Sequence, residues 1–331
     1  MNVTDSHFIN NTAHDGAVMH LSDIQSGVLM MQNSLTNNLA EHHGVIYSFG
    51  STVVIQDMVL EDNTGSMYTY NCNLTFERNI TFMNNILPHL GEQQEGGALT
   101  TFYSNVIILG HLHLLYNKAK DGGAILSVNS KLHVYRSTTI ANNIALDTGC
   151  GIYFYQSQLF CHDQSKLELK NNHATNAGGG IHAIDSIISI ELDRTNDTRI
   201  TFLENTANNG GGVYLEVNAK IQILKKHLRY EHSLVFKSNI AAQYGGAMFL
   251  ADDTYSATCY SNSSLMYSAT TECFLQTIAL FSYQSRKLSL VTIEFTDNLA
   301  AISGSNLYGG LLDRYTVSPF TDVYWFTNEG R

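Results

Sequence analysis

A short motif recurs along almost the whole chain: an apolar residue, two variable residues and then an asparagine. Eight of the nine intervals between the motif asparagines are 22 to 34 residues long, and the last is 59. A repeat of this length is typical of one coil of a solenoid, in which each coil packs against its neighbours. The long interval predicts a degenerate coil. The motif asparagines are Asn11, Asn38, Asn63, Asn85, Asn117, Asn143, Asn172, Asn205, Asn239 and Asn298.

Small-residue clusters follow several of these asparagines and open new apolar segments. Glycine pairs would cost a helix roughly 1 kcal/mol per glycine, whereas a turn that needs positive φ accepts glycine easily. Asparagine also tolerates that backbone region, and stacked asparagine amides can form a hydrogen-bonded ladder. We therefore expect both residue types to be structural. The glycines assigned to this role are Gly97, Gly123, Gly179, Gly211 and Gly246.

The segments before the asparagines alternate apolar and polar residues, as in Leu167 and Leu169 or Ile293 and Phe295. This period of two predicts half-buried strands. We predict an all-β fold, a right-handed parallel β-helix solenoid of about ten or eleven coils. Only 14% of the residues are charged, which fits a stack in which like charges would repel each other.

The chain is predicted to form one elongated domain over residues 1–310, with an inserted loop at about 252–290 and a truncated C-terminal tail at 311–331. Cys259 and Cys273 lie in the insertion and are a candidate disulfide, which would contribute roughly 3 kcal/mol. Cys150 and Cys161 are a second candidate pair, or alternatively core residues.

Phe-x-x-Asn and Gly-Gly-Ala segments together carry a resemblance to a known family. Over roughly residues 1–310 the chain resembles chlamydial polymorphic outer-membrane proteins. The resemblance implies a right-handed β-helix passenger of the pectin-lyase-like superfamily and a surface-exposed adhesin. The segment Ser303–Arg314 is similar to uncharacterised β-helix surface proteins of simple animals. The segments that carry the resemblance are 8–11, 76–79, 82–85, 202–205, 236–239 and 295–298 for Phe-x-x-Asn, and 96–98, 122–124 and 245–247 for Gly-Gly-Ala.

Charge and hydropathy exclude several kinds of partner. The net charge is −11, which argues against nucleic acid and anionic lipid, because both need basic patches. The chain contains no apolar run of the ~20 residues that a membrane helix needs. The pairs His42–His43 and His111/His113 lack a further ligand at fixed spacing, so we expect no metal and no cofactor.

Catalysis is not expected, although pectin-lyase-like folds can host polysaccharide lyases and hydrolases. Glycoside hydrolysis needs two carboxyl groups roughly 5–9.5 Å apart, and no column of this repeat is acidic. Asp121 and Asp147 precede their glycines by different offsets, and the adjacent pair Asp252–Asp253 lies in the predicted insertion.

One column of residues suggests a binding surface. The residue after the first aliphatic position of each apolar segment should point outward, and it is aromatic in several coils. Such a strip could contact sugar rings or another protein, unless a loop or a bent strand covers it. The candidate strip is Tyr153, His182, Tyr214, Phe249 and Tyr308.

The function we expect is therefore that of a non-catalytic protein, extracellular or on the cell surface, that binds a glycan or protein ligand. It would act as a monomer or as part of a larger chain. The alternatives are a polysaccharide lyase or hydrolase and a purely structural solenoid fragment.

Overall fold

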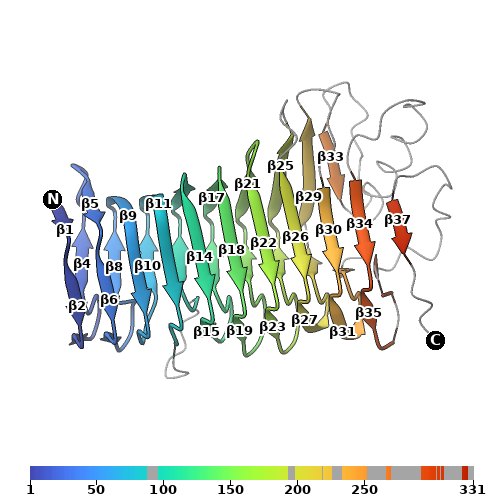
Figure 1. Ribbon diagram of the computed structural model, residues 1–331, viewed down its shortest axis with the longest axis horizontal. Helices are drawn as coiled ribbons and strands as arrows, with labels where there is room; N and C mark the ends of the chain where they lie inside the picture. Colours follow the sequence, from blue (N-terminus) through green and yellow to red (C-terminus); the bar gives the residue numbers. More distant parts are fainter. Residues whose placement is uncertain are drawn as a thin grey trace.

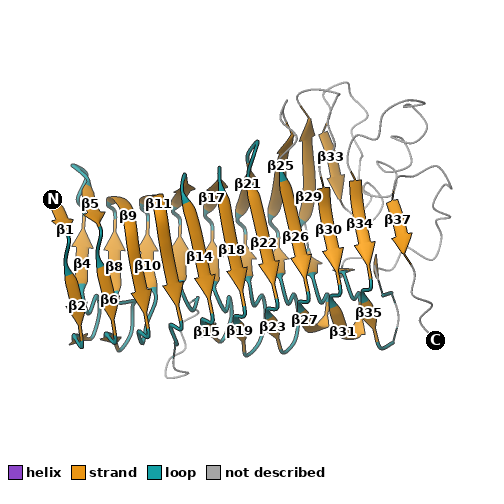
Figure 2. Cartoon of the chain, in the orientation of Figure 1, coloured by secondary structure: helices purple, strands orange, loops and turns teal. Residues whose placement is uncertain are grey.

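The computed structural model describes residues 1–87, 96–192, 198–217, 219–225, 233–251, 266–269, 292–302, 304–305, 307–308 and 323–326. Strands, turns and bends make up these residues, and none of them is helical (Figure 2). The strands stack side by side along one long axis, with the N-terminus at one end (Figure 1). This architecture confirms the predicted all-β parallel β-helix.

One wall of the solenoid is a ten-stranded sheet to which each coil contributes one strand. Its strands are parallel and lie in register, so that equivalent residues of successive coils form straight columns. The strands are β4 (Met19–Ser22), β8 (Ile46–Phe49), β10 (Met67–Tyr70), β12 (Leu99–Phe102), β16 (Ile125–Val128), β20 (Ile152–Tyr155), β24 (Ile181–Ile184), β28 (Val213–Glu216), β32 (Met248–Leu250) and β36 (Leu307–Tyr308).

A nineteen-stranded sheet forms the largest wall, and most coils contribute two consecutive strands to it. Two longer strands, β9 (Thr52–Glu61) and β11 (Asn73–Met83), run through both rows. The first row holds β1 (Asn2–Thr4), β5 (Val28–Met31), β13 (Asn105–Ile108), β17 (Lys131–Val134), β21 (Gln158–Cys161), β25 (Ile187–Leu192), β29 (Lys220–Lys225) and β33 (Met266–Ala269). The second row holds β2 (His7–Ile9), β6 (Ser34–Thr36), β14 (His111–Leu115), β18 (Ser137–Ala141), β22 (Lys166–Lys170), β26 (Arg199–Leu203), β30 (Ser233–Lys237), β34 (Thr292–Thr296) and β37 (Val323–Phe326).

Short strands complete each coil. A six-stranded sheet contains β15 (Lys118–Ala119), β19 (Ile144–Ala145), β23 (His173–Ala174), β27 (Thr206–Asn209), β31 (Ile240–Tyr244) and β35 (Leu299–Ala300), and a two-stranded sheet contains β3 (Thr12–Ala13) and β7 (Leu39–Ala40). The core fills the space between the walls with one residue of a column above the next. The rings of Phe202 and Phe236, for example, stack with centroids 4.8 Å apart, and those of Phe236 and Phe295 with centroids 5.2 Å apart.

The motif asparagines form one unbroken ladder from Asn11 to Asn298. In each inner rung the side-chain Nδ2 donates to Oδ1 of the next asparagine and to the carbonyl of the apolar residue that begins the preceding motif. Asn143, which is fully buried, donates from Nδ2 to Asn172 Oδ1 at 2.9 Å and to the Leu114 carbonyl at 3.0 Å. Its Oδ1 accepts the backbone N–H and a side-chain N–H of Asn117. The amide thus uses both donors and both lone pairs, which explains why the position is asparagine in every coil.

Two details of the repeat differ from the expectations. Asn239 donates directly to Asn298 Oδ1 at 2.9 Å, and β30 pairs in register with β34, so the expected degenerate coil between these asparagines is absent. The long interval is an insertion within one coil. Of the predicted insertion 252–290, residues 266–269 form β33, which pairs antiparallel with β29, and the remainder lies outside the described residues. The strand β37, within the predicted tail, pairs with β34.

The left-handed backbone conformation is also placed differently. It belongs to the residue before each ladder asparagine, such as Asn142 with φ 57° before Asn143, and not to the ladder asparagine itself. Likewise Gly178 has φ 64°, whereas the assigned Gly179 has no positive φ. A Cβ at Gly179 would lie 2.4 Å from the Gly211 carbonyl oxygen of the next coil. Glycine is therefore needed at that position for the close approach of two coils.

A second ladder, not anticipated from the sequence, lies where the ten-stranded sheet turns into the nineteen-stranded one. The backbone N–H of Ser104 donates to Ser130 Oγ at 3.0 Å, and that of Ser130 donates to Ser157 Oγ at 3.1 Å. Cys72 occupies the same column, because its N–H donates to Ser104 Oγ. Each of these serines directly follows a left-handed residue, as Ser130 follows Asn129 with φ 49°.

Candidate functional site

The five residues of the predicted strip are register neighbours in the ten-stranded sheet. Tyr153 pairs with His182, His182 with Tyr214, Tyr214 with Phe249, and Phe249 with Tyr308. Phe154, beside Tyr153 in β20, belongs to the main hydrophobic core cluster, whereas Tyr153, His182, Tyr214 and Phe249 do not. The alternation read from the sequence therefore places the column on the correct face.

The strip is less accessible than expected. Only 8% of Tyr153 and 5% of His182 is exposed, while Tyr214 and Phe249 are half-buried. Burial, with contributions from Asp121 and Glu216, raises the pKa of Tyr153 to about 12. An exposed position is therefore wrong for Tyr153 and His182, and the side chain of Tyr308 lies outside the described residues. Whether the strip binds a ligand stays a prediction.

The strip rings also contact each other. Tyr214 and Phe249 stack in parallel with centroids 4.8 Å apart, and His182 lies nearly perpendicular to both Tyr153 and Tyr214. A ring whose face is occupied by the ring of the next coil directs its edge outward. The strip therefore offers less flat surface for a sugar ring than its composition suggests.

Two aromatic columns extend this surface toward the N-terminus. One continues the strip through Tyr68, Tyr47 and His20, and the other lies two residues further along the strands. The small-residue clusters before Tyr47 and Tyr68 are degenerate, as in Gly65-Ser66-Met67, and the second column lies two residues beyond the position that the repeat singles out. The described rings on the outward side of the ten-stranded sheet, here called the aromatic face, are His20, Tyr47, Phe49, Tyr68, Tyr70, Phe102, Tyr153, Tyr155, His182, Tyr214 and Phe249.

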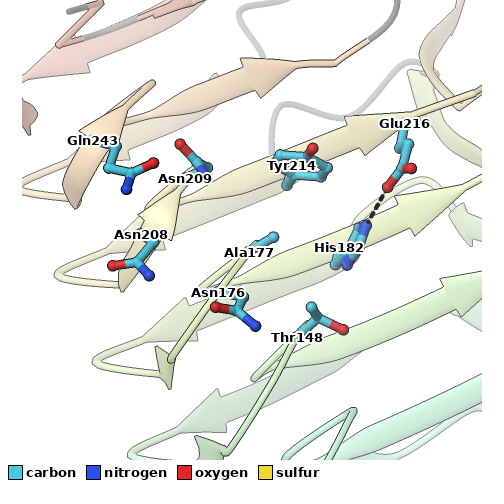
Figure 3. A pocket seen from close by; sticks show the side chains of 9 residues that line it. All are labelled: Thr148, Asn176, Ala177, His182, Asn208, Asn209, Tyr214, Glu216 and Gln243. Carbon is cyan, nitrogen blue, oxygen red and sulfur yellow. Dashed lines mark hydrogen bonds and ion pairs between the residues drawn. The ribbon is translucent and has the colours of Figure 1, made fainter. Parts of the chain in front are cut away.

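A groove of about 390 Å³ borders the aromatic face on the side of the six-stranded sheet. Figure 3 shows amide side chains along one side of it and His182, Tyr214 and Glu216 along the other. His182 Nε2 lies 3.2 Å from Glu216 Oε2, and two buried atoms, His182 Nδ1 and Asn209 Oδ1, have no hydrogen-bond partner. This amide groove is lined by Thr148, Asn176, Ala177, His182, Asn208, Asn209, Tyr214, Glu216 and Gln243.

A second groove, of about 470 Å³, borders the other edge, where the ten-stranded sheet turns into the nineteen-stranded one. Its lining has four asparagines and one cation, Lys131, and contains no carboxylate. We call it the histidine groove. It is lined by Asn71, Cys72, Asn73, Tyr103, Ser104, Asn105, Asn129, Lys131, His133 and Phe160.

His133 of the histidine groove belongs to a hydrogen-bonded chain of three side chains from three successive coils. His133 Nδ1 lies 3.0 Å from His162 Nε2, and His162 Nδ1 lies 2.8 Å from Glu191 Oε2. The imidazole of His133 stacks on Phe160, and that of His162 on Tyr135 at 3.9 Å. Sequence reasoning could not find this chain, because its members are 29 residues apart in neighbouring coils and match no motif.

The other candidate groups have structural partners. Asp121 accepts hydrogen bonds from the backbone and hydroxyl of Thr148, and Asp147 accepts one from Asn176. Within the described part of the chain, no group of three or more His, Cys, Asp or Glu side chains could hold a metal ion. Asp252 and Asp253 lie outside the described residues.

The cysteines correct one expectation. Cys150 and Cys161 are both buried and free, so the alternative of a disulfide between them is wrong and the core assignment holds. Burial raises the pKa of both thiols, that of Cys161 to about 12. Cys72 is also buried and free, and its Sγ accepts the Ser51 N–H. The candidate pair Cys259 and Cys273 lies outside the described residues.

Comparison with known proteins supports a relation to surface-protein repeats. Residues 199–216, which include β26, Asn205 and β28, match the Chlamydia polymorphic membrane protein repeat. Metabotropic glutamate receptor-like protein P of Dictyostelium discoideum is 27% identical over 187 residues, which cover 48% of this chain and 13% of that protein. No solved structure matches the chain.

No helix that is long and apolar enough to cross a membrane occurs among the residues that the structure describes.

Proposed function

We propose that this chain is the non-catalytic β-helix of an extracellular or cell-surface protein, and that it binds a glycan or protein ligand along the outward side of its ten-stranded sheet. The solenoid would serve as a rigid support that holds this surface away from its attachment point. Rigidity follows from the ladder of buried, fully hydrogen-bonded asparagines, which fixes each coil to the next.

The observation that carries the proposal is the grouping of three features on one wall. The aromatic face lies between two polar grooves, the amide groove at the start of the strands and the histidine groove beyond their ends. Several of its rings are substantially exposed, among them Phe49 at 36% and Tyr155 at 39%. Aromatic side chains with adjacent amide and hydroxyl groups are typical of ligand-binding surfaces.

The surface location is supported by the two similarities. The two names, a polymorphic membrane protein repeat and a receptor-like protein, both describe membrane-associated proteins, and each match covers part of this chain. Neither similarity identifies a ligand, so the ligand class is inferred from the side chains of the chain itself.

The proposal that the chain is non-catalytic is supported by the partners of its acidic groups. Asp121, the one buried acidic residue in the part of the chain that the structure describes, accepts a hydrogen bond from the Thr148 hydroxyl and is thereby held as a structural acceptor. A polysaccharide lyase or hydrolase would need two acidic or basic groups converging on one sugar.

Two assays on the same purified chain test this proposal. A glycan array combined with binding to cultured animal and protist cells should detect a ligand, and the same glycans should remain intact after prolonged incubation. Release of reducing or unsaturated sugar ends, without retention on any surface, would refute the proposal in favour of the enzyme alternative.

A further inference from the structure

The histidine groove differs in charge from the rest of the chain. The molecule has a net charge of −11, yet the lining of this groove contains one cation and no carboxylate. Lys131 is exposed, and none of the ion pairs between described residues includes it. A groove with an unpaired ammonium group and several amides favours a ligand that carries a negative charge and many hydroxyl groups.

The hydrogen bonds from His133 to His162 and from His162 to Glu191 fix the orientation of the His133 ring. An ionised carboxylate can only accept hydrogen bonds, so His162 Nδ1 must donate to Glu191. In neutral His162 the other nitrogen, Nε2, then accepts, and His133 Nδ1 is the donor to it. By elimination, the lone pair of neutral His133 is on Nε2.

His133 Nε2 remains available to a ligand. It has no hydrogen-bond partner in the described part of the chain, and it is not among the buried polar atoms that lack one. The His133 side chain is half-buried and lines the groove together with Lys131 and Phe160. A ligand in the groove can therefore contact His133 Nε2, while His133 Nδ1 is already hydrogen-bonded to His162.

We propose that the histidine groove binds an acidic sugar, with the sugar carboxylate between Lys131 Nζ and His133 Nε2 and the sugar hydroxyls on the asparagine amides. Asn105 pairs in register with Lys131 of the next coil, and Asn129 lies two residues before Lys131, so the two amides come from successive coils and supply both donors and acceptors. This inference rests on the proposed binding function, and it names the ligand class and the residues.

Proton uptake should accompany binding. Neutral His133 presents only a lone pair at Nε2, which repels a carboxylate, whereas the imidazolium form donates a hydrogen bond to it. In the free protein, burial first, then His162 and Lys131, lowers the pKa of His133, while Glu191 opposes them. The other titratable groups nearby are Tyr135, which stacks on His162, and Tyr103 and Cys72, which line the groove. A bound carboxylate must raise the His133 pKa, so affinity increases as the pH falls.

Nuclear magnetic resonance on the full chain with ¹⁵N-labelled histidine tests the proposal. The probes are methyl β-glucuronide and methyl β-glucoside, which differ by a carboxylate in place of a hydroxymethyl group. We expect the glucuronide to bind about tenfold more tightly at pH 5.5 than at pH 7.5 and to raise the pKa of His133 alone. The glucoside should bind at least tenfold more weakly at pH 5.5.

Variants assign the effect to the groove. His133→Gln and Lys131→Met should each weaken glucuronide binding at least fivefold, and His133→Gln should also abolish its pH dependence. His113→Gln, on the outward side of β14, is the matched control and should bind as the parent does. Circular dichroism checks that each variant is folded, and His133→Asn replaces His133→Gln if the latter is not.

Equal binding of the two glycosides, no binding of either, or glucuronide binding unchanged in the His133 variant would each overturn this inference. Each of these results leaves the proposed function open to its own test, because cell binding through another ligand does not require the histidine groove.

Discussion

Replacing one inner rung of the asparagine ladder should destabilise the fold far more than replacing a terminal rung. Asn143→Ala removes four side-chain hydrogen bonds: two accepted from Asn117, one donated to Asn172 and one donated to the Leu114 carbonyl. Asn11→Ala removes one side-chain bond, the one donated to Asn38 Oδ1. The two substitutions delete the same atoms and differ in the number of partners left behind.

The magnitude follows from the net value of a hydrogen bond. At about 1 kcal/mol each, four bonds are worth about 4 kcal/mol and one bond about 1 kcal/mol. The cost at Asn143 is increased because it is fully buried, so that the Asn117 N–H and the Leu114 carbonyl lose partners where water cannot replace them. A loss of 4 kcal/mol is a large fraction of the stability of a typical domain.

Native-state hydrogen exchange is the suitable assay, because repeat arrays can open locally instead of unfolding in one step. In Asn143→Ala, the backbone amide of Asn117 should lose about 100- to 1000-fold of its protection, and amides two or more coils away should change much less. In Asn11→Ala, the Asn117 amide should be unaffected. Urea unfolding of both variants provides the global comparison.

Similar losses in the two variants, or an Asn117 amide whose protection is unchanged in Asn143→Ala, would refute the reasoning. Either result would mean that packing of the coils, and not the ladder, determines their stability.

Three further predictions concern the close contacts and buried groups. Gly179→Ala should lower the free energy of unfolding in urea by about 2–3 kcal/mol, because the new Cβ would lie 2.4 Å from the Gly211 carbonyl oxygen. Gly27→Ala, at φ 88° with open space around it, should lower it by about 1 kcal/mol. The pKa of Tyr153 is raised to about 12 in the folded protein. The stabilisation by its neutral form is therefore complete below about pH 10 and is lost as the pH rises through about 12. In thermal melts, Tyr153→Phe should lose less stability than the parent between about pH 9.5 and 11.5. Cys161, buried and with a raised pKa, should resist iodoacetamide at pH 8 in the native protein and react after denaturation, as read by peptide mass spectrometry.

Each of these predictions has a clear contrary result. Equal costs at Gly179 and Gly27 would show that neighbouring coils do not limit the glycine column. An identical alkaline loss in Tyr153→Phe would place the titrating groups elsewhere, and rapid native alkylation of Cys161 would mean that the core around it opens readily.

The sequence predicts the repeat well because a solenoid converts sequence period into spatial columns. Asn117 and Asn143 are neighbours in the ladder for the same reason that they are neighbours in the motif series. The motif does not locate the left-handed residue, since it shows which residues recur and does not show which of two adjacent residues bends the backbone. Asn142 and Asn143 differ in this respect although both are asparagine.

Features that depend on what covers a surface were harder to predict. Alternation placed Tyr153 and His182 on the outward side, but it could not show that they are nearly inaccessible. The chain of His133, His162 and Glu191 joins three coils at positions with no shared motif, so it appears only when the coils are stacked in register.

The central claim is that the outward side of the ten-stranded sheet is a binding surface, and cell binding by face-specific variants tests it most directly. Phe49→Glu with Tyr155→Glu places two charges on that side, at residues 36% and 39% exposed. Val59→Glu with Ile144→Glu places two charges on the nineteen- and six-stranded sheets, at residues 38% and 40% exposed, and is the matched control. With both variants folded, the first should lose at least tenfold in cell binding and the control should bind as the parent does. Equal binding by the two variants, whether retained or lost, would contradict the claim.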